Sequence, residues 1–263
     1  FSHDEITVGC GGKQVIYNAL LASIDKEDEI IIPSPYWVSY PDMVLLAGGK
    51  PKIVKCDEKD GFKLTPKKLK KAITKKTKWL ILNSPSNPTG SGYTKDEIEN
   101  LSKVLIKNKK VHILSDDIYE HITYDNFNFF TIAQVSKLKE RTLTMNGVSK
   151  SYAMTGWRIG YAAGPKEIIK AIDDQKNEEI SALQATLLEK NRTLGFLSAH
   201  DTITGLYNRN HMIQRAEEEI SRFQRFQTTA SLIILELTHS HDDGHSLEAS
   251  SLEEPLKVVA TQC

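Results

Sequence analysis

The sequence predicts an α/β protein, with a three-layer α/β/α arrangement around a mostly parallel sheet in residues 1–172. Short β-type runs alternate there with amphipathic helical stretches, so successive strands require crossover connections. Near residue 173 this alternation stops, and a long helical pattern without proline begins. We therefore expect a heptad-like helix in residues 173–200 and a partial α+β segment in residues 201–263.

The expected strands of the sheet are short apolar runs bounded by turn residues or helices. Pro33 and Pro35 end the first run, because proline removes a backbone donor. The strands occupy residues 29–32, 52–54, 79–82, 111–114 and 142–145, and the helices occupy residues 15–23, 66–73 and 95–107. In a parallel sheet, ligand-binding groups gather in the loops beyond the carboxyl ends of the strands. Candidate site residues are therefore expected in those loops.

The second part of the chain is expected to contain two helices and a strand. The first helix carries apolar residues at the a and d spacing of a heptad, interrupted by Lys190. These residues are Ile180, Leu183, Leu187, Leu194 and Leu197. An ordinary amphipathic helix that packs on its own domain is the alternative interpretation. A second helix is expected over residues 209–226 and a strand over residues 231–237.

The composition indicates a globular protein in a reducing compartment. Its 263 residues are 40% hydrophobic and 26% charged, and 34 basic side chains balance 34 acidic ones. A chain without a basic excess has no electrostatic reason to bind nucleic acid, and no apolar run is long enough to span a membrane. Three scattered cysteines do not form a disulfide framework. We therefore expect a cytoplasmic protein without nucleic-acid or membrane partners.

The segment around Lys150 indicates covalent chemistry. Lys150 follows a buried strand in a loop rich in glycine and serine, where a desolvated amine would attack an aldehyde. Arg158 follows in the same segment, and its forked donors suit a phosphate. Surface lysines and arginines are common, so this pair indicates a site only in combination with other loops.

Two further loops offer groups that suit a phosphate and an aromatic ring. Gly11, Gly12 and Lys13 lead into a helix, whose free N–H groups and dipole suit an anion. Asp116 and Tyr119 follow a buried strand and offer a carboxylate and a phenol. A plain helix-entry turn and a solvated loop are the respective alternatives.

Together with the turn at Asn87 (sequence NPTG) and the aromatic stretch around Trp37, these loops resemble the fold-type I aminotransferases, in the order that family has them. The likeness is greatest to the bacterial aspartate/prephenate aminotransferases and covers residues 1–172. The resemblance implies the large-domain fold of that family and pyridoxal 5'-phosphate as cofactor. It also implies an amino acid and a 2-oxo acid as substrates, amino-group transfer between them, and a homodimer.

The resemblance assigns a role to each candidate residue. Lys150 would hold the cofactor aldehyde as a Schiff base and, once released, would move the proton of the substrate Cα. Asp116 would keep the pyridine nitrogen protonated, and Tyr119 and Asn87 would bond the phenolic oxygen. Trp37 would stack on the ring, and Trp37 and Asn87 would position the substrate. The phosphate would be surrounded by Gly11, Gly12, Lys13, Ser149 and Arg158.

The likeness to aminotransferases ends near Ile172, before the rest of the large domain and the small domain of that family. The arginine that grips the substrate α-carboxylate in the family belongs to that remaining part. Such a clamp orients the Cα–H bond for removal. We therefore expect an incomplete transaminase.

Residues 201–209 (sequence DTITGLYNR) resemble the opening of a GGDEF domain, the diguanylate cyclase family. The helices and the strand expected around this segment fit a signalling coiled coil followed by the first helix and strand of that family. The name-giving loop is missing from the sequence, and Glu236 stands where the family's metal-binding aspartate would lie. The polar residues 239–245 are interpreted as a solvated loop and not as a metal site. The resulting alternatives are a signalling or interaction protein with a degenerate GGDEF segment, and an inactive fusion fragment.

Overall fold

The computed structural model describes residues 1–226. It divides into two compact units, Phe1–Ile180 and a second unit that begins at Ser181. The strand expected at residues 231–237, Glu236 and the histidines of residues 239–245 lie outside the described residues. Within residues 1–226, no helix has the length and apolar character needed to cross a membrane.

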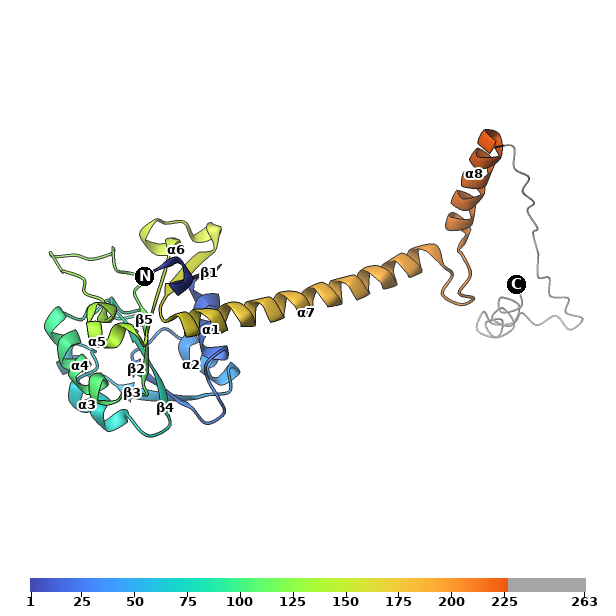
Figure 1. Ribbon diagram of the computed structural model, residues 1–263. Coiled ribbons are helices and arrows are strands. Elements are labelled where there is room, and N and C mark those ends of the chain that lie inside the picture. The colour runs from blue at the N-terminus through green and yellow to red at the C-terminus, as the bar shows by residue number, and fades with distance from the viewer. Residues whose placement is uncertain (227–263) are drawn as a thin grey trace, which may run out of the picture. The chain divides into compact units, whose positions relative to one another are not determined.

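A seven-stranded sheet forms the middle layer of the first unit (Figure 1). The strands are β1 (Ile6–Cys10), β2 (Glu29–Ser34), β3 (Lys50–Lys55), β4 (Thr77–Asn83), β5 (His112–Asp116), β6 (Thr142–Gly147) and β7 (Ile159–Ala163). They lie in the order β1-β7-β6-β5-β4-β2-β3. The pairs β3/β2, β2/β4, β4/β5 and β5/β6 are parallel. β7 is antiparallel to both of its neighbours, β6 and β1. The predicted mostly parallel sheet is thus confirmed.

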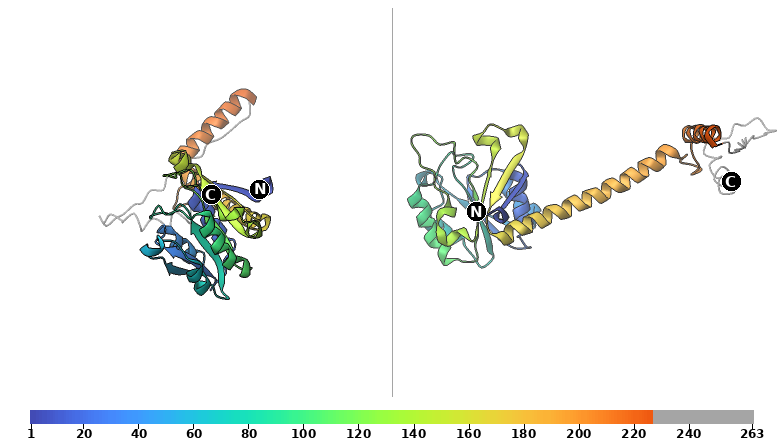
Figure 2. Two further views of the ribbon diagram at one scale, coloured as in Figure 1. Left: turned by 90° about the vertical axis from the view of Figure 1, so that its left-hand side faces the viewer. Right: turned by 45° about the horizontal axis from the view of Figure 1, so that its top comes forward.

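Helices cover both faces of this sheet. They are α1 (Gly12–Leu21), α2 (Ser39–Leu46), α3 (Pro66–Ala72), α4 (Lys95–Lys107), α5 (Ser136–Lys139) and α6 (Val148–Ser151). Short 3-10 turns are η1 (His3–Glu5), η2 (Glu58–Asp60), η3 (Ile132–Gln134) and η4 (Thr155–Trp157). α1 and α2 pack on one face, and α3, α4 and α5 pack on the other (Figures 1 and 2). The three-layer α/β/α arrangement is therefore confirmed.

Successive residues of the central strands point into different layers, as strand geometry requires. In β2, Ile30 and Ile32 belong to the core under α1 and α2, while Ile31 belongs to the core under α3 and α4. Trp79 and Ile81 of β4 extend the first of these cores. Burial on both faces explains why these strands appear in the sequence as continuous apolar runs.

Most expected elements of the first unit are present, with shifts at their ends. α4 has the predicted bounds, because Thr94 caps its first turn and Glu97 completes a capping box. β2 continues through Pro33 to Ser34, although the sequence indicated a stop at Pro33. β1, β7 and α2 were not predicted. The strands β1 and β7 each contain glycine and small residues, which weakens the apolar signal.

The helix expected from residue 173 begins earlier, as α7 (Lys166–Ala199), and continues past the division predicted at residue 172. Ile169 and Ile172 of its first turns are buried in the first core. Nζ of Lys176 donates a hydrogen bond to the carbonyl oxygen of Val8 at 2.9 Å, which connects the helix to β1. In the second unit, α8 (Arg209–Phe226) has the predicted bounds.

Candidate active site

A cavity of about 190 Å³ opens in the first unit, beyond the carboxyl ends of the central strands. Its walls come from the start of α1, the start of α2, the loops after β4 and β5, and the segment from α6 to η4. The predicted residues that line it are Gly12, Lys13, Trp37, Asn87, Asp116, Tyr119, Ser149, Lys150 and Arg158. Side chains far apart in the sequence therefore meet at the edge where a parallel sheet gathers ligand groups.

One end of the cavity combines two glycines, the start of α1 and Arg158. Gly11 has a φ of 83°, and a Cβ atom on it would lie 2.4 Å from Nη2 of Arg158. A Cβ atom on Gly12 would lie 2.8 Å from the sulfur of Met145. Gly11 thus keeps room for the guanidinium of Arg158 beside the first turn of α1, and Gly12 allows that turn to pack against Met145. Free N–H groups at a helix start, together with a guanidinium, suit a phosphate.

The floor of the cavity carries a buried carboxylate. Asp116 ends β5 and is 4% exposed. One oxygen accepts a hydrogen bond from the hydroxyl of Tyr40, and the other accepts one from the N–H of Ile118 at 3.3 Å. Burial raises the pKa of Asp116 to about 6, although both hydrogen bonds lower it. A buried carboxylate of this kind gains from a ligand that brings an N–H group or a positive charge.

The neighbouring Asp117 has a different environment. It accepts hydrogen bonds from the hydroxyls of Ser115 and Thr131, both at 2.7 Å, and does not line the cavity. Burial raises the pKa of Asp117 to about 7. Asp117 therefore holds the loop near Thr131 to the end of β5, and of the two adjacent carboxylates only Asp116 faces the cavity.

Tyr119 and Asn87 meet on another wall. Burial raises the pKa of the Tyr119 hydroxyl, the charge of Asp116 raises it further, and a hydrogen bond with Asn87 lowers it. Asn83 holds this arrangement in place, since its Nδ2 donates to the carbonyl oxygen of Asp116 at 2.9 Å. Its Oδ1 accepts from the N–H of Asn87 at 2.7 Å. The ends of β4 and β5 are thus locked to the turn that carries Asn87.

Lys150 reaches over the cavity from α6. Its Nζ lies 6.0 Å from the centre of the Tyr119 ring. Lys150 is exposed, so the prediction of a desolvated amine at this position is wrong. Lys150 nevertheless lines the cavity, together with the half-buried Ser149.

Trp37 provides a flat apolar wall. Its half-buried ring meets the ring of Tyr40 edge-on, with centroids 5.4 Å apart and planes at 88°. Nζ of the exposed Lys13 lies 5.1 Å from the centre of the Trp37 ring. An indole held in this way offers a surface on which an aromatic ligand stacks.

Several residues that line the cavity were not predicted from the sequence. Tyr40 and Asn83 are the important ones, and Ile118, Met145 and Thr155 also line it. Asn83 had a usable signal, since it ends a buried strand as Asp116 does. Tyr40 lies in the aromatic stretch around Trp37, but its contact with Asp116 depends on α2, which was not predicted.

Comparison with known proteins assigns the chain to a family. The family model for aminotransferase class I and II matches residues 1–223. A probable aspartate/prephenate aminotransferase of Rickettsia typhi is 63% identical over 170 residues, which are 64% of this chain and 43% of that protein. The aspartate/prephenate aminotransferase of Cereibacter sphaeroides is 58% identical over 178 residues, or 67% of this chain and 44% of that protein. The chain therefore spans less than half the length of these curated relatives.

Solved structures give the same result. The aspartate aminotransferase of Rhizobium meliloti is 54% identical, with a TM-score of 0.66 over 67% of this chain and 45% of that one. The aspartate aminotransferase of Thermus thermophilus with maleate is 46% identical, with a TM-score of 0.63 over 65% of this chain and 44% of that one. Enzymes of this family depend on pyridoxal phosphate. The sheet, the cavity and these likenesses together show that the chain belongs to the class I and II aminotransferases.

Proposed function

We propose that this chain forms the cofactor-binding core of a pyridoxal-phosphate-dependent aminotransferase, with Lys150 as the residue that holds the cofactor. The observation that carries the proposal is the convergence of three unlike groups on one cavity. These are the amine of Lys150, the buried carboxylate of Asp116, and the anion site formed by Gly11, Gly12 and Arg158.

The residues fit the cofactor group by group. The anion site at the start of α1 would take the phosphate, with Lys13 and Ser149 beside it. Asp116 would face the pyridine nitrogen, whose N–H would supply the partner that a buried carboxylate requires. Trp37 would cover the face of the ring. When bound, the cofactor supplies an electron sink for the negative charge that develops at a substrate Cα.

The polar residues on the walls would then perform the remaining tasks. Lys150 would attack the cofactor aldehyde as a nucleophile and later carry a proton to and from the substrate Cα. Tyr119 and Asn87 would donate hydrogen bonds to the phenolic oxygen of the ring, since they line the cavity side by side and bond each other. Asn87, with Trp37, would also help to position the substrate.

The substrates follow from the relatives. Two relatives are described as aspartate/prephenate aminotransferases, and one solved relative is described with maleate, a dicarboxylate. We infer amino-group transfer from aspartate or a similar amino acid to a 2-oxo acid. Since the chain spans 43% and 44% of these two relatives, this activity is proposed for the whole protein.

We also propose a cytoplasmic homodimer. Large apolar side chains near the cavity are exposed, among them Val38 at 75% and Trp157 at 68%. Apolar surface of this kind is typical of a protein contact. In the described residues Cys10 and Cys56 are free thiols, as a reducing compartment would maintain them.

The test of the cofactor proposal is covalent trapping at Lys150. The purified chain is mixed with pyridoxal 5'-phosphate and reduced with borohydride, and the product is located by peptide mass mapping. We expect one stable adduct on Lys150 and its complete loss in Lys150→Ala, because only an amine forms the reducible bond. Lys103→Ala, on the exposed surface of α4, is the matched control and should keep the adduct. An intact chain without an adduct, or an equal yield from Lys150→Ala, would contradict the proposal.

A second candidate function has support from α7. Five apolar residues at a and d spacing along this helix are each between 47% and 70% exposed. They are Ile180, Leu183, Leu187, Leu194 and Leu197. An exposed stripe with this spacing suits helix pairing in a dimer. It therefore supports an interaction or signalling role for the second part of the chain, in which the GGDEF likeness of residues 201–209 stays a prediction.

The double substitution Leu183→Asp with Leu187→Asp tests this role. If the stripe pairs two chains, we expect the dimer dissociation constant to rise at least about a hundredfold, since a buried unpaired carboxylate costs several kcal/mol. Sedimentation equilibrium at several concentrations measures the constant, and Glu189→Ala on the same helix is the control. A monomeric wild-type chain, or an unchanged dimer in the double variant, would exclude pairing through this stripe.

A further inference from the structure

We propose that Tyr40 is a positioning residue for Asp116, orienting its carboxylate and holding it as an anion that faces the bound ring. The inference rests on the proposed function, because the ring is that of the cofactor. It extends that function to a residue on α2 that was not among the predicted site residues.

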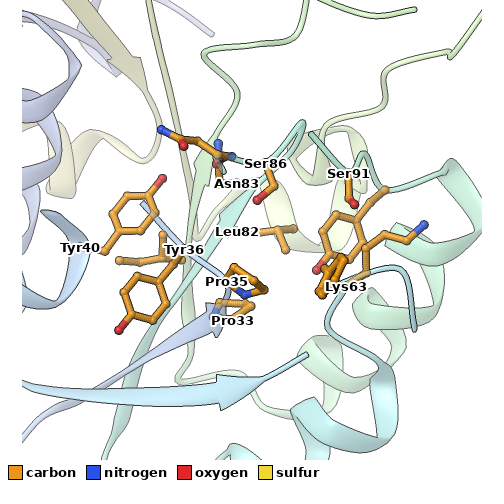
Figure 3. Close-up of a pocket in the computed structure, with 13 residues that line it drawn as sticks. Pro33, Pro35, Tyr36, Tyr40, Lys63, Leu82, Asn83, Ser86 and Ser91 are labelled. Carbon is orange, nitrogen blue, oxygen red and sulfur yellow. Dashed lines mark hydrogen bonds between the residues drawn. The ribbon is translucent and has the colours of Figure 1, made fainter. Parts of the chain in front are cut away.

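The contacts of Tyr40 fit this role. Tyr40 is 2% exposed, and its ring packs in the core under α1 and α2. A smaller pocket of about 20 Å³ shares Tyr40, Asn83 and Asn87 with the main cavity. Figure 3 shows the hydroxyl of Tyr40 pointing towards Asn83, whereas that of Tyr36 points away. The Tyr40 hydroxyl donates to Asp116 at this place.

Asp116 is consequently held from three directions. Tyr40 of α2 bonds one carboxylate oxygen, and the N–H of Ile118 bonds the other at 3.3 Å. Asn83 of β4 bonds the main-chain carbonyl oxygen of Asp116 at 2.9 Å. Of these three contacts, the one with Tyr40 is the one that connects the carboxylate of β5 to a helix. Removing that hydroxyl would therefore free one oxygen without disturbing the backbone of β5.

The charges around Asp116 also favour a role for Tyr40 in keeping this carboxyl ionised. The titratable groups that face Asp116 are Tyr40 from α2, and Tyr119 and Asp117 from the turn after β5. Burial favours the neutral acid form of Asp116, and the hydrogen bond from Tyr40 opposes this by lowering its pKa. Burial also raises the pKa of Tyr40 well above its ordinary value, so the hydroxyl remains a donor. A carboxylate stabilised in this way is a weaker base and leaves the proton on the ring nitrogen.

Tyr40→Phe removes the hydroxyl and keeps the ring in the core. In the cofactor-free chain, we expect the titration midpoint of the Asp116 carboxyl, followed by carbon-13 NMR, to rise by about one pH unit. In the chain loaded with nitrogen-15-labelled pyridoxal phosphate, we expect the ring-nitrogen signal to move towards its unprotonated position. A purely structural role of Tyr40 would change neither signal.

Tyr93→Phe is the matched control. Tyr93 is 4% exposed, and its hydroxyl accepts a hydrogen bond from the N–H of Leu64 at 2.7 Å, in the other core. This variant loses a buried hydroxyl but should leave both Asp116 signals unchanged. If Tyr40→Phe does not fold, 3-fluorotyrosine at position 40 provides a stronger donor, and the Asp116 midpoint should fall.

The possible results separate the two proposals. An Asp116 midpoint that is unchanged in Tyr40→Phe overturns the inference, as does an unchanged ring-nitrogen signal in the loaded chain. A wild-type chain that does not bind the cofactor overturns the proposed function. In that case the titration of the cofactor-free chain still decides whether Tyr40 holds Asp116 as an anion.

Discussion

Replacing Gly160 with alanine is expected to destabilise the first unit by about 3 kcal/mol or more, because the added methyl group has no space. Gly160 lies in β7, paired with Gly9 of β1 and Gly147 of β6. A Cβ atom on Gly160 would lie 2.3 Å from the nitrogen of Gly12 and 2.4 Å from the carbonyl carbon of Gly11. These are backbone atoms, which have no alternative rotamer to adopt.

The same backbone cannot retreat without moving Gly11 against Arg158, in the proposed phosphate site. Gly11 already lies against the guanidinium of Arg158 and has a φ of 83°. We therefore expect Gly160→Ala to weaken binding of pyridoxal phosphate together with stability. Urea unfolding measures the stability, as a lower midpoint at constant slope.

Gly156→Ala is the control for this substitution. No atom lies within 4 Å of a Cβ built on Gly156, and its backbone needs no positive φ. A substitution of this kind should change stability by no more than about 0.5 kcal/mol. If Gly160→Ala were as harmless as Gly156→Ala, the close contact between β7 and the start of α1 would not exist in solution.

The cofactor-free chain is expected to lose stability as the pH rises from about 4 to 7, with Asp117 as the main cause. Burial raises the pKa of Asp117 in the folded chain to about 7 and that of Asp116 to about 6, from an ordinary 3.8. The unfolded chain therefore releases these protons near pH 4, while the folded chain retains them. For Asp117 alone the difference corresponds to about 4 kcal/mol.

The folded state binds these protons more tightly than the unfolded state does. A raised carboxyl pKa stabilises the folded state at low pH, and this advantage disappears as the pH passes through the folded pKa. His112 acts in the opposite direction, because burial lowers its pKa below 6.5. The loss of stability should therefore be steeper below pH 6, where both aspartates contribute, than above pH 7, where the folded chain has also released these protons.

Asp117→Asn isolates this contribution. An amide can still bond the hydroxyls of Ser115 and Thr131 but does not titrate. Urea unfolding at pH 5, 6, 7 and 8 should show a smaller loss of stability in Asp117→Asn, which should be the more stable protein at pH 8. Equal pH dependence in both proteins would show that Asp117 is not the buried acid that the structure describes.

The secondary structure of the central strands and of α4 and α8 followed from the sequence, because long apolar runs and helix caps are local signals. α2, β1 and β7 did not follow. The strands β1 and β7 lie at one side of the sheet and include glycine and small residues, so their pairing partners decide their conformation.

The candidate site shows the same division. The types of group in the site, an amine, a carboxylate and a glycine turn with an arginine, were evident from the sequence, and so was the likeness to aminotransferases. The exposure of Lys150 was not, since burial depends on which parts of the fold cover a loop. The role of Asn83 could have been inferred from its position at the end of a strand, as that of Asp116 was.

The family and the types of reactive group could be read from the amino-acid order. Which of the two adjacent carboxylates faces the cavity, and which side chain supports it, depends on how the helices pack on the sheet. Successive residues at a strand end point in different directions. Asp116 therefore faces the cavity, whereas Asp117 bonds Ser115 and Thr131 away from it. Tyr40 meets Asp116 only because α2 packs on the same face as α1, a contact between segments 76 positions apart.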